Sequence, residues 1–129
     1  MFLIDSSAWI EYLRPGGSQK VKERIRDILQ KGEAACCGIV VVEILRGAKN
    51  DKDFNSLRDS LLSLPQMPID DVVIERASKW GYMLDRKGKV ASTTDLLIAS
   101  AAYKKARLLH LDRDFEMIGS LVGLAEERL

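Results

Sequence analysis

The sequence predicts an α/β fold with three layers, in which a mainly parallel sheet is flanked by helices on both faces. Short apolar runs typical of buried strands occur near the start of the chain, near residue 35 and near residue 109, and longer segments with helical periodicity lie between them. A chain of 129 residues can bury a real core but is short for two ordinary domains. We therefore expect residues 1–129 to form one domain.

The first elements alternate between strand and helix. Residues 2–4 form a buried strand, residues 5–7 a turn, and residues 8–13 a short helix that stops before Pro15. Ser18 is the expected N-cap of the next helix, whose apolar stripe comprises Val21, Ile25, Ile28 and Leu29. The charged residues on the other side of this helix indicate a solvated face.

The middle of the chain continues the pattern. Residues 33–38 contain a second strand, and residues 39–48 a helix that ends near Gly47. Residues 54–62 form an amphipathic helix, residues 66–69 a brief strand or extended link, and a longer helix begins at residues 70–71. Apolar residues also surround the adjacent Cys36 and Cys37, so we interpret them as small buried side chains and not as a disulfide or a metal site.

The last third centres on residues 93–103, which are apolar on nearly all sides and therefore predict a buried helix with Thr94 as a candidate N-cap. A buried strand follows over residues 108–111. The tail is expected to hold a short helical turn around residues 117–118 and an edge strand near residues 124–126.

Composition sets limits on function. The chain has 20 basic and 19 acidic residues and a formal net charge of +1, so no strong global field attracts nucleic acid or an anionic membrane, and a polyanion must be held by a local patch. The sequence shows no signal peptide and no apolar run of membrane-spanning length, so we expect a cytoplasmic protein without a membrane partner.

Carboxylates stand where the predicted strands end. Asp5 and Asp112 directly follow the first and the late strand, and ligands bind beyond the carboxyl ends of strands in parallel sheets. Asp95, in the first turn of the buried helix, faces the same edge if that helix is antiparallel to the strands. Glu43 follows the second strand by one to two helical turns. These four acids are therefore expected to share one crevice.

A cation explains such a crevice better than capping does. A carboxylate at a helix N-terminus gains about 0.3–1 kcal/mol, whereas two carboxylates about 4 Å apart repel by on the order of 4 kcal/mol at an effective dielectric near 20. Because no histidine or cysteine set accompanies the acids, the pattern favours Mg²⁺, with Mn²⁺ as the alternative, over zinc. For Glu43 alone, an ion pair with Arg46 and a metal-directed role are equally open.

Four short motifs carry a family resemblance. They are Asp5-Ser6-Ser7 after an apolar strand, Glu43 in Val-Val-Glu-Ile-Leu-Arg-Gly-Ala, Asp95 in Thr-Asp-Leu-Leu-Ile-Ala, and His-Leu-Asp-Arg-Asp-Phe at residues 110–115. Each is weak alone, but together and in this order they resemble the PIN-domain nucleases over essentially the whole chain. Within that family the sequence is most similar to VapC-type toxins of prokaryotic toxin-antitoxin modules.

The resemblance implies a toxic Mg²⁺-dependent endoribonuclease that hydrolyses structured RNA, such as a tRNA or a ribosomal RNA loop. It also implies a cognate antitoxin, and either a homodimer or a toxin-antitoxin hetero-oligomer. Asp5, Glu43 and Asp95 match the acidic core of the family. Asp112 and Asp114 both fit the fourth acid, and Asp112 is favoured because it follows the strand.

Several further residues receive weaker assignments. Ser7, or Ser6, matches the hydroxyl residue that supports the metal shell in the family. Arg46, Lys89 and Arg113 are candidates for phosphate contact, although a solvated surface position is the favoured interpretation of each. The lone His110 lies on an apolar strand and is expected to be structural.

Three other protein classes fit less well. A receiver-like signalling domain needs paired acids after the first strand and a lysine after a late one, and this chain has neither. A haloacid-dehalogenase-type phosphatase needs a second aspartate at position 7, which is a serine. A catalytically silent PIN-like scaffold that binds RNA or protein is the remaining alternative to the enzyme.

Overall fold

The computed structural model describes residues 1–129, which form five strands and seven helices. The strands are β1 (Phe2–Ile4), β2 (Ala34–Cys37), β3 (Gln66–Met67), β4 (Arg107–His110) and β5 (Glu126–Arg128). The helices are α1 (Ser6–Leu13), α2 (Gln19–Gln30), α3 (Gly38–Leu45), α4 (Asp51–Leu62), α5 (Asp71–Arg86), α6 (Thr93–Ala102) and α7 (Arg113–Val122).

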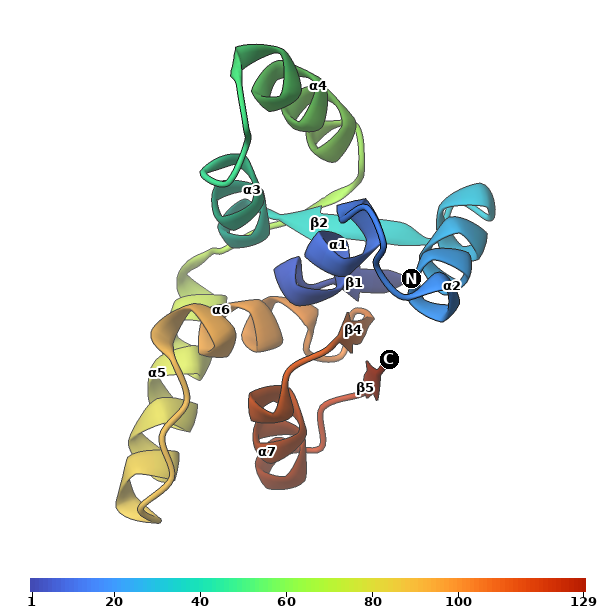
Figure 1. Cartoon of the computed structure of the whole chain (residues 1–129). Coiled ribbons are helices and arrows are strands. Elements are labelled where there is room, and N and C mark those ends of the chain that lie inside the picture. The colour runs from blue at the N-terminus through green and yellow to red at the C-terminus, as the bar shows by residue number, and fades with distance from the viewer.

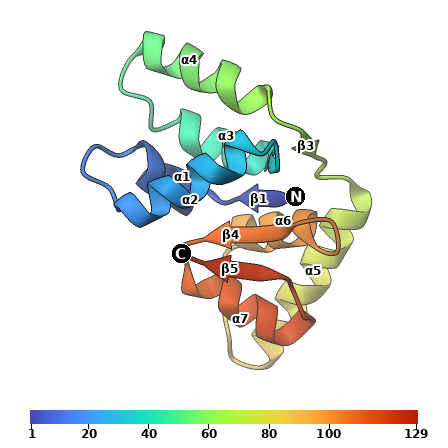
Figure 2. The same cartoon turned by 90° about the vertical axis from the view of Figure 1, so that its right-hand side faces the viewer.

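The five strands form one sheet in the order β3-β2-β1-β4-β5, and every neighbouring pair is parallel. The first strand is therefore central, with Leu3 opposite both Ala35 of β2 and Leu108 of β4. Figure 2 shows α2 in front of the strands and α6 behind them. The predicted α/β fold with helices on both faces is confirmed, and the sheet is parallel throughout.

Burial on both faces explains why the inner strands lack alternating polar residues. Leu3 and Ile4 of β1 and all four residues of β2 are buried. Cys36 and Cys37 are free thiols within that strand, as predicted, and burial raises the pKa of Cys36 to about 12. The two cysteines thus pack as small apolar residues.

Helix α6 packs between β4 and α5, as its apolar sequence predicts. Its residues 98–102 are all fully or almost fully buried. The one polar side chain among them, Ser100, donates to the carbonyl oxygen of Val73 over 2.8 Å and accepts from Arg76 Nε over 3.0 Å. These bonds join α6 to α5 and satisfy the buried hydroxyl.

Figure 1 shows that α4 lies at the opposite end of the molecule from α5 and α7. Helix α3 connects α4 to the sheet, whereas α6 and α7 lie beside β4 and β5. None of the helices combines the length and the apolar character that crossing a membrane requires.

The predicted starts of α1, α4 and α6 were wrong. Helix α4 begins at Asp51 and not at residue 54, because the side chain of Asn50 caps it by accepting from the backbone N–H of Asp53. Residues 6 and 7 belong to the first turn of α1 and not to a separate turn, because the Asp5 side chain caps the helix by accepting from the backbone N–H of Ser7. The N-cap of α6 is Ser92 and not Thr94, because the hydroxyl of Ser92 accepts from the backbone N–H of Asp95. The predicted Ser18 cap of α2 is confirmed.

The tail also differs from the prediction. Helix α7 has ten residues instead of a short turn, and it ends at Val122, where Gly123 caps it in the left-handed conformation at φ 72°. The edge strand begins at Glu126, two residues later than the predicted segment. It pairs with β4 in parallel and forms one edge of the sheet.

Candidate active site

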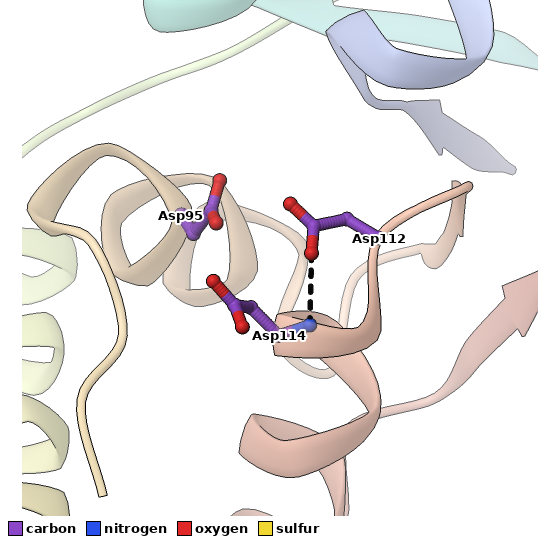
Figure 3. Close-up of side chains that lie close together, drawn as sticks. All are labelled: Asp95, Asp112 and Asp114. Carbon is purple, nitrogen blue, oxygen red and sulfur yellow. Dashed lines mark hydrogen bonds between the residues drawn. The ribbon is translucent and has the colours of Figure 1, made fainter.

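Three aspartates meet where β4 leads into α7. Asp95 lies in the first turn of α6, and Asp112 and Asp114 lie at the start of α7. Each offers a carboxylate oxygen within 4.8 Å of the other two. Figure 3 shows the three side chains turned toward one another. We call this group the aspartate cluster.

Asp112 and Asp114 both belong to the cluster, so the structure does not choose between them as the fourth acid. Strand β4 ends at His110, and Asp112 is the N-cap of α7. Its Oδ1 accepts from the backbone N–H of Asp114 over 2.9 Å, which fixes the two residues relative to each other (Figure 3).

Asp5 directly follows β1, has only 3% of its surface exposed, and lies near enough to the aspartate cluster for its charge to raise the pKa of Asp95. Its Oδ2 accepts from the backbone N–H and the hydroxyl of Ser7, at 3.0 and 2.6 Å. Its Oδ1 is buried and has no hydrogen-bond partner. An unpartnered buried carboxylate oxygen is costly, and a bound cation would supply the missing partner.

Ser7 also links Asp5 to the segment that carries Asp112. The same hydroxyl that donates to Asp5 accepts from the backbone N–H of Leu111 over 3.0 Å. The first strand end and the β4-α7 connection are therefore held together by one side chain. This is the place of the hydroxyl residue that the family resemblance assigns to metal-shell support.

Glu43 lies in α3 outside the aspartate cluster and is half-buried. Its Oε1 accepts from the hydroxyl of Ser6 over 3.1 Å. Arg46 is exposed and forms no salt bridge with it, so the ion pair that the sequence left open does not form. Glu43 lies close enough to Asp5 for the charge of Asp5 to contribute to raising the pKa of the Glu43 carboxyl.

Burial and neighbouring negative charge raise the pKa values of Asp95, Asp5 and Glu43. Burial, followed by the charges of Asp112, Asp5 and Asp114, raises the pKa of Asp95 to about 7. Burial also raises the pKa of Asp5, against the lowering effect of its bonds to Ser7, and raises the pKa of Glu43. Desolvation and like charge thus disfavour the ionised acids, and a cation would reverse both effects.

The oxygen atoms that could bind a metal at this site fit a hard divalent cation. The aspartate cluster and the free Oδ1 of Asp5 offer only carboxylate oxygens, which suit Mg²⁺ or Mn²⁺. His110 is fully buried, and both its ring nitrogens have partners within the protein, so it offers no ligand atom. The expectation of a structural His110 agrees with this placement.

Comparison with known proteins shows which family the chain belongs to. The model of the PIN domain matches residues 2–121. The chain is 37% identical to the ribonuclease VapC11 of Mycobacterium tuberculosis, with 96% of each chain covered, and 32% identical to VapC32 of the same organism, with 98% covered. The chain belongs to the PIN-domain family, among the VapC ribonucleases.

Solved structures agree with the PIN fold. VapBC2 from Rickettsia felis, bound to a DNA fragment from its promoter, matches with a TM-score of 0.80 at 20% identity and covers 99% of this chain and 98% of its own. VapC20 of Mycobacterium tuberculosis, described as a sarcin-ricin loop cleaving toxin, matches with a TM-score of 0.68 at 18% identity over both full chains. At these identities the likeness shows the fold alone.

Other site residues of this PIN domain stay predictions. Arg46, Lys89 and Arg113 are exposed and form no salt bridge, which leaves them available to phosphate and equally consistent with a solvated surface. Sequence reasoning missed Glu126, whose carboxylate contacts His110. No local spacing signals this contact, because Glu126 reaches His110 only through the pairing of β5 with β4.

Proposed function

We propose that this protein is a toxic endoribonuclease that uses a divalent cation, Mg²⁺ or Mn²⁺, to hydrolyse phosphodiester bonds in structured RNA. The observation that carries the proposal is the aspartate cluster, which brings three carboxylates within 4.8 Å beside the unpartnered oxygen of Asp5. The named VapC ribonucleases support RNA as the substrate, and the described target of VapC20 supports a structured one.

Asp5, Asp95, Asp112 and Asp114 would hold the cation, and Glu43 would hold a second one or orient the attacking water. When bound, the cation supplies a lower pKa for water and offsets charge on the reacting phosphate. The protein contributes orientation, because Ser7 fixes the Asp5 carboxylate, Ser6 fixes that of Glu43 and the Asp114 amide fixes that of Asp112. Such preorganised groups need no rearrangement during the reaction.

We propose a cognate antitoxin as the protein partner, because solved relatives include VapBC toxin-antitoxin complexes. A groove of about 580 Å³ between α1, α3 and α4 would receive a segment of it. Exposed Ile10 and Leu13 give the groove apolar contacts. The charged residues of its lining are two acids and two bases, Glu43, Asp53, Arg14 and Lys49. An antitoxin segment in this groove would lie against Glu43 and so block the site.

The first experiment is cleavage of total cellular RNA, containing tRNA and ribosomal RNA, by the purified chain freed of any partner. We expect discrete fragments with Mg²⁺, none with chelator, and loss of more than about 100-fold in rate for Asp95→Asn, since even outer-shell changes at metal sites cost 10- to 100-fold. Sequencing the fragment ends would identify the cleaved RNA.

Asp85→Asn is the matched control. Asp85 is an exposed acid at the end of α5 without a side-chain hydrogen bond or salt bridge, so its variant should cleave like the wild type. Failure of the folded wild type to cleave with either Mg²⁺ or Mn²⁺ would contradict the nuclease and favour a silent RNA- or protein-binding scaffold. Cleavage that survives Asp95→Asn would place the reaction elsewhere.

A further inference from the structure

His110 connects the edge strand β5 to the aspartate cluster. Its imidazole is fully buried at the end of β4. Nδ1 accepts from the backbone N–H of Asp112 over 3.1 Å, and Nε2 lies 2.6 Å from Oε2 of Glu126. Because Nδ1 must offer its lone pair to Asp112, the ring proton is on Nε2 and is donated to the Glu126 carboxylate.

The ring has little freedom to leave this position. Phe115 of α7 packs against it, with ring centroids 5.1 Å apart and planes inclined by 52°. Phe115 is itself fully buried. Rotation of the imidazole would therefore break both of its hydrogen bonds and displace a core side chain.

The two residues between β4 and α7 depend on side chains for their backbone hydrogen bonds. The N–H of Leu111 donates to the Ser7 hydroxyl, and the N–H of Asp112 donates to His110. Neither N–H takes part in the sheet or in α7. The position of Asp112 is thus set from one side by the Asp5-Ser7 pair and from the other by the Glu126-His110 pair.

We infer that His110 is a positioning residue, which, together with Glu126, holds the Asp112 backbone where its carboxylate can join the aspartate cluster around a divalent cation. The inference rests on the metal-binding part of the proposed function. It gives the C-terminal strand β5 a role in the site, although no residue of that strand reaches the aspartate cluster. Outer-shell partners of this kind change metal affinity by about 10- to 100-fold when removed.

The test is the dissociation constant of Mn²⁺. Mn²⁺ is titrated into the metal-free protein, and the concentration of unbound Mn²⁺ is measured from its electron paramagnetic resonance signal. His110→Leu loses both hydrogen bonds and should weaken Mn²⁺ binding about 10-fold. His110→Asn keeps an acceptor near the place of Nδ1 and should recover most of that loss. Glu126→Ala removes the hydrogen bond to Nε2 of the His110 ring and should weaken Mn²⁺ binding by a smaller factor.

Glu127→Ala is the matched control, because Glu127 is the next residue of the same strand and pairs with Arg24 instead of His110. It should bind Mn²⁺ like the wild type. If His110→Leu does not fold, Glu126→Ala still decides the question, since the Glu126 side chain is partly exposed at the sheet edge.

A purely structural role would lower the melting temperatures of His110→Asn and Glu126→Ala and leave the Mn²⁺ dissociation constants of both at the wild-type value, which would overturn the inference. Wild-type protein that binds no Mn²⁺ would instead overturn the metal site itself. The two failures are therefore distinguishable in one set of titrations.

Discussion

At the residue scale, the raised pKa of Asp95 should make the stability of the protein depend on pH. Burial and the charges of three neighbouring aspartates raise its pKa to about 7, from about 4 in an unfolded chain. Between these pH values the folded chain binds a proton that the unfolded chain does not. The free energy of unfolding of the metal-free protein should therefore rise as the pH falls from about 7 toward 4, by linkage.

Asp95→Asn should remove this contribution. We expect the variant to be more stable than the wild type at pH 8 in the presence of chelator, where the wild-type carboxylate is ionised next to like charges, and the advantage should shrink toward pH 5. Urea unfolding at both pH values measures the difference. Parallel pH dependences of the two proteins would show that Asp95 titrates normally.

At the residue scale, the sequence predicted which acids approach one another but not how each is held. Asp5, Asp95 and Asp112 follow strands or open a helix, and the structure places Asp112 close enough to the other two for its charge to raise their pKa values. The Ser7-Leu111 contact spans 104 positions in the chain, so no local pattern could indicate it. Such contacts follow from strand order, which local patterns leave open.

At the element scale, the site depends on how α1 and the β4-α7 connection are joined. The Ser7 hydroxyl donates to Asp5 and accepts from Leu111, so it serves both elements. Ser7→Ala would leave the partly buried backbone N–H of Leu111 without its partner and would free Asp5 Oδ2 from its shorter bond. We expect a loss of about 1–3 kcal/mol in the free energy of unfolding.

Chemical denaturation of Ser7→Ala measures this loss in the free energy of unfolding, with Ser120→Ala as the control. Ser120 is an exposed serine in α7 whose hydroxyl bonds only to the backbone of its own helix, so its variant should be within about 0.5 kcal/mol of the wild type. Equal stability of both variants would mean that solvent replaces Ser7 at no cost.

The elements themselves were predictable to different degrees. The strands β1, β2 and β4 were predicted within a residue or two, because strands buried on both faces leave continuous apolar runs. Helix α7 is longer than predicted, because Gly119 lowers helix propensity in its interior while the Asp112 side chain caps its first turn. Ser92, Thr93 and Thr94 are all suitable caps, and only the hydrogen bond to the Asp95 amide distinguishes them.

At the scale of the whole molecule, metal binding and folding should be coupled, because the aspartate cluster draws its ligands from α6 and α7 and depends on Asp5 after β1. Mn²⁺ at 100 times its dissociation constant should stabilise the folded chain by about 2.7 kcal/mol. For a chain of this size that corresponds to a rise in melting temperature on the order of 10 °C.

Thermal unfolding with Mn²⁺ and with chelator measures this coupling, and Asp112→Asn should abolish most of the rise. A wild-type melting temperature that is the same with Mn²⁺ and with chelator would contradict the coupling.

The fold class and the family were predictable at this scale, because the order of the four motifs along the chain is specific. That residues 1–129 act as one domain, and that the protein forms a homodimer, stay predictions.

Whether the aspartate cluster and Asp5 hold a divalent cation is tested most directly by locating Mn²⁺ by anomalous scattering in a crystal of the protein. We expect a peak within roughly 2.0–2.3 Å of carboxylate oxygens from Asp95 and from Asp112 or Asp114, with Asp5 Oδ1 directed toward it. A crystal that holds Mn²⁺ only elsewhere, grown from protein that cleaves RNA with Mn²⁺, would contradict a catalytic cation held by the aspartate cluster.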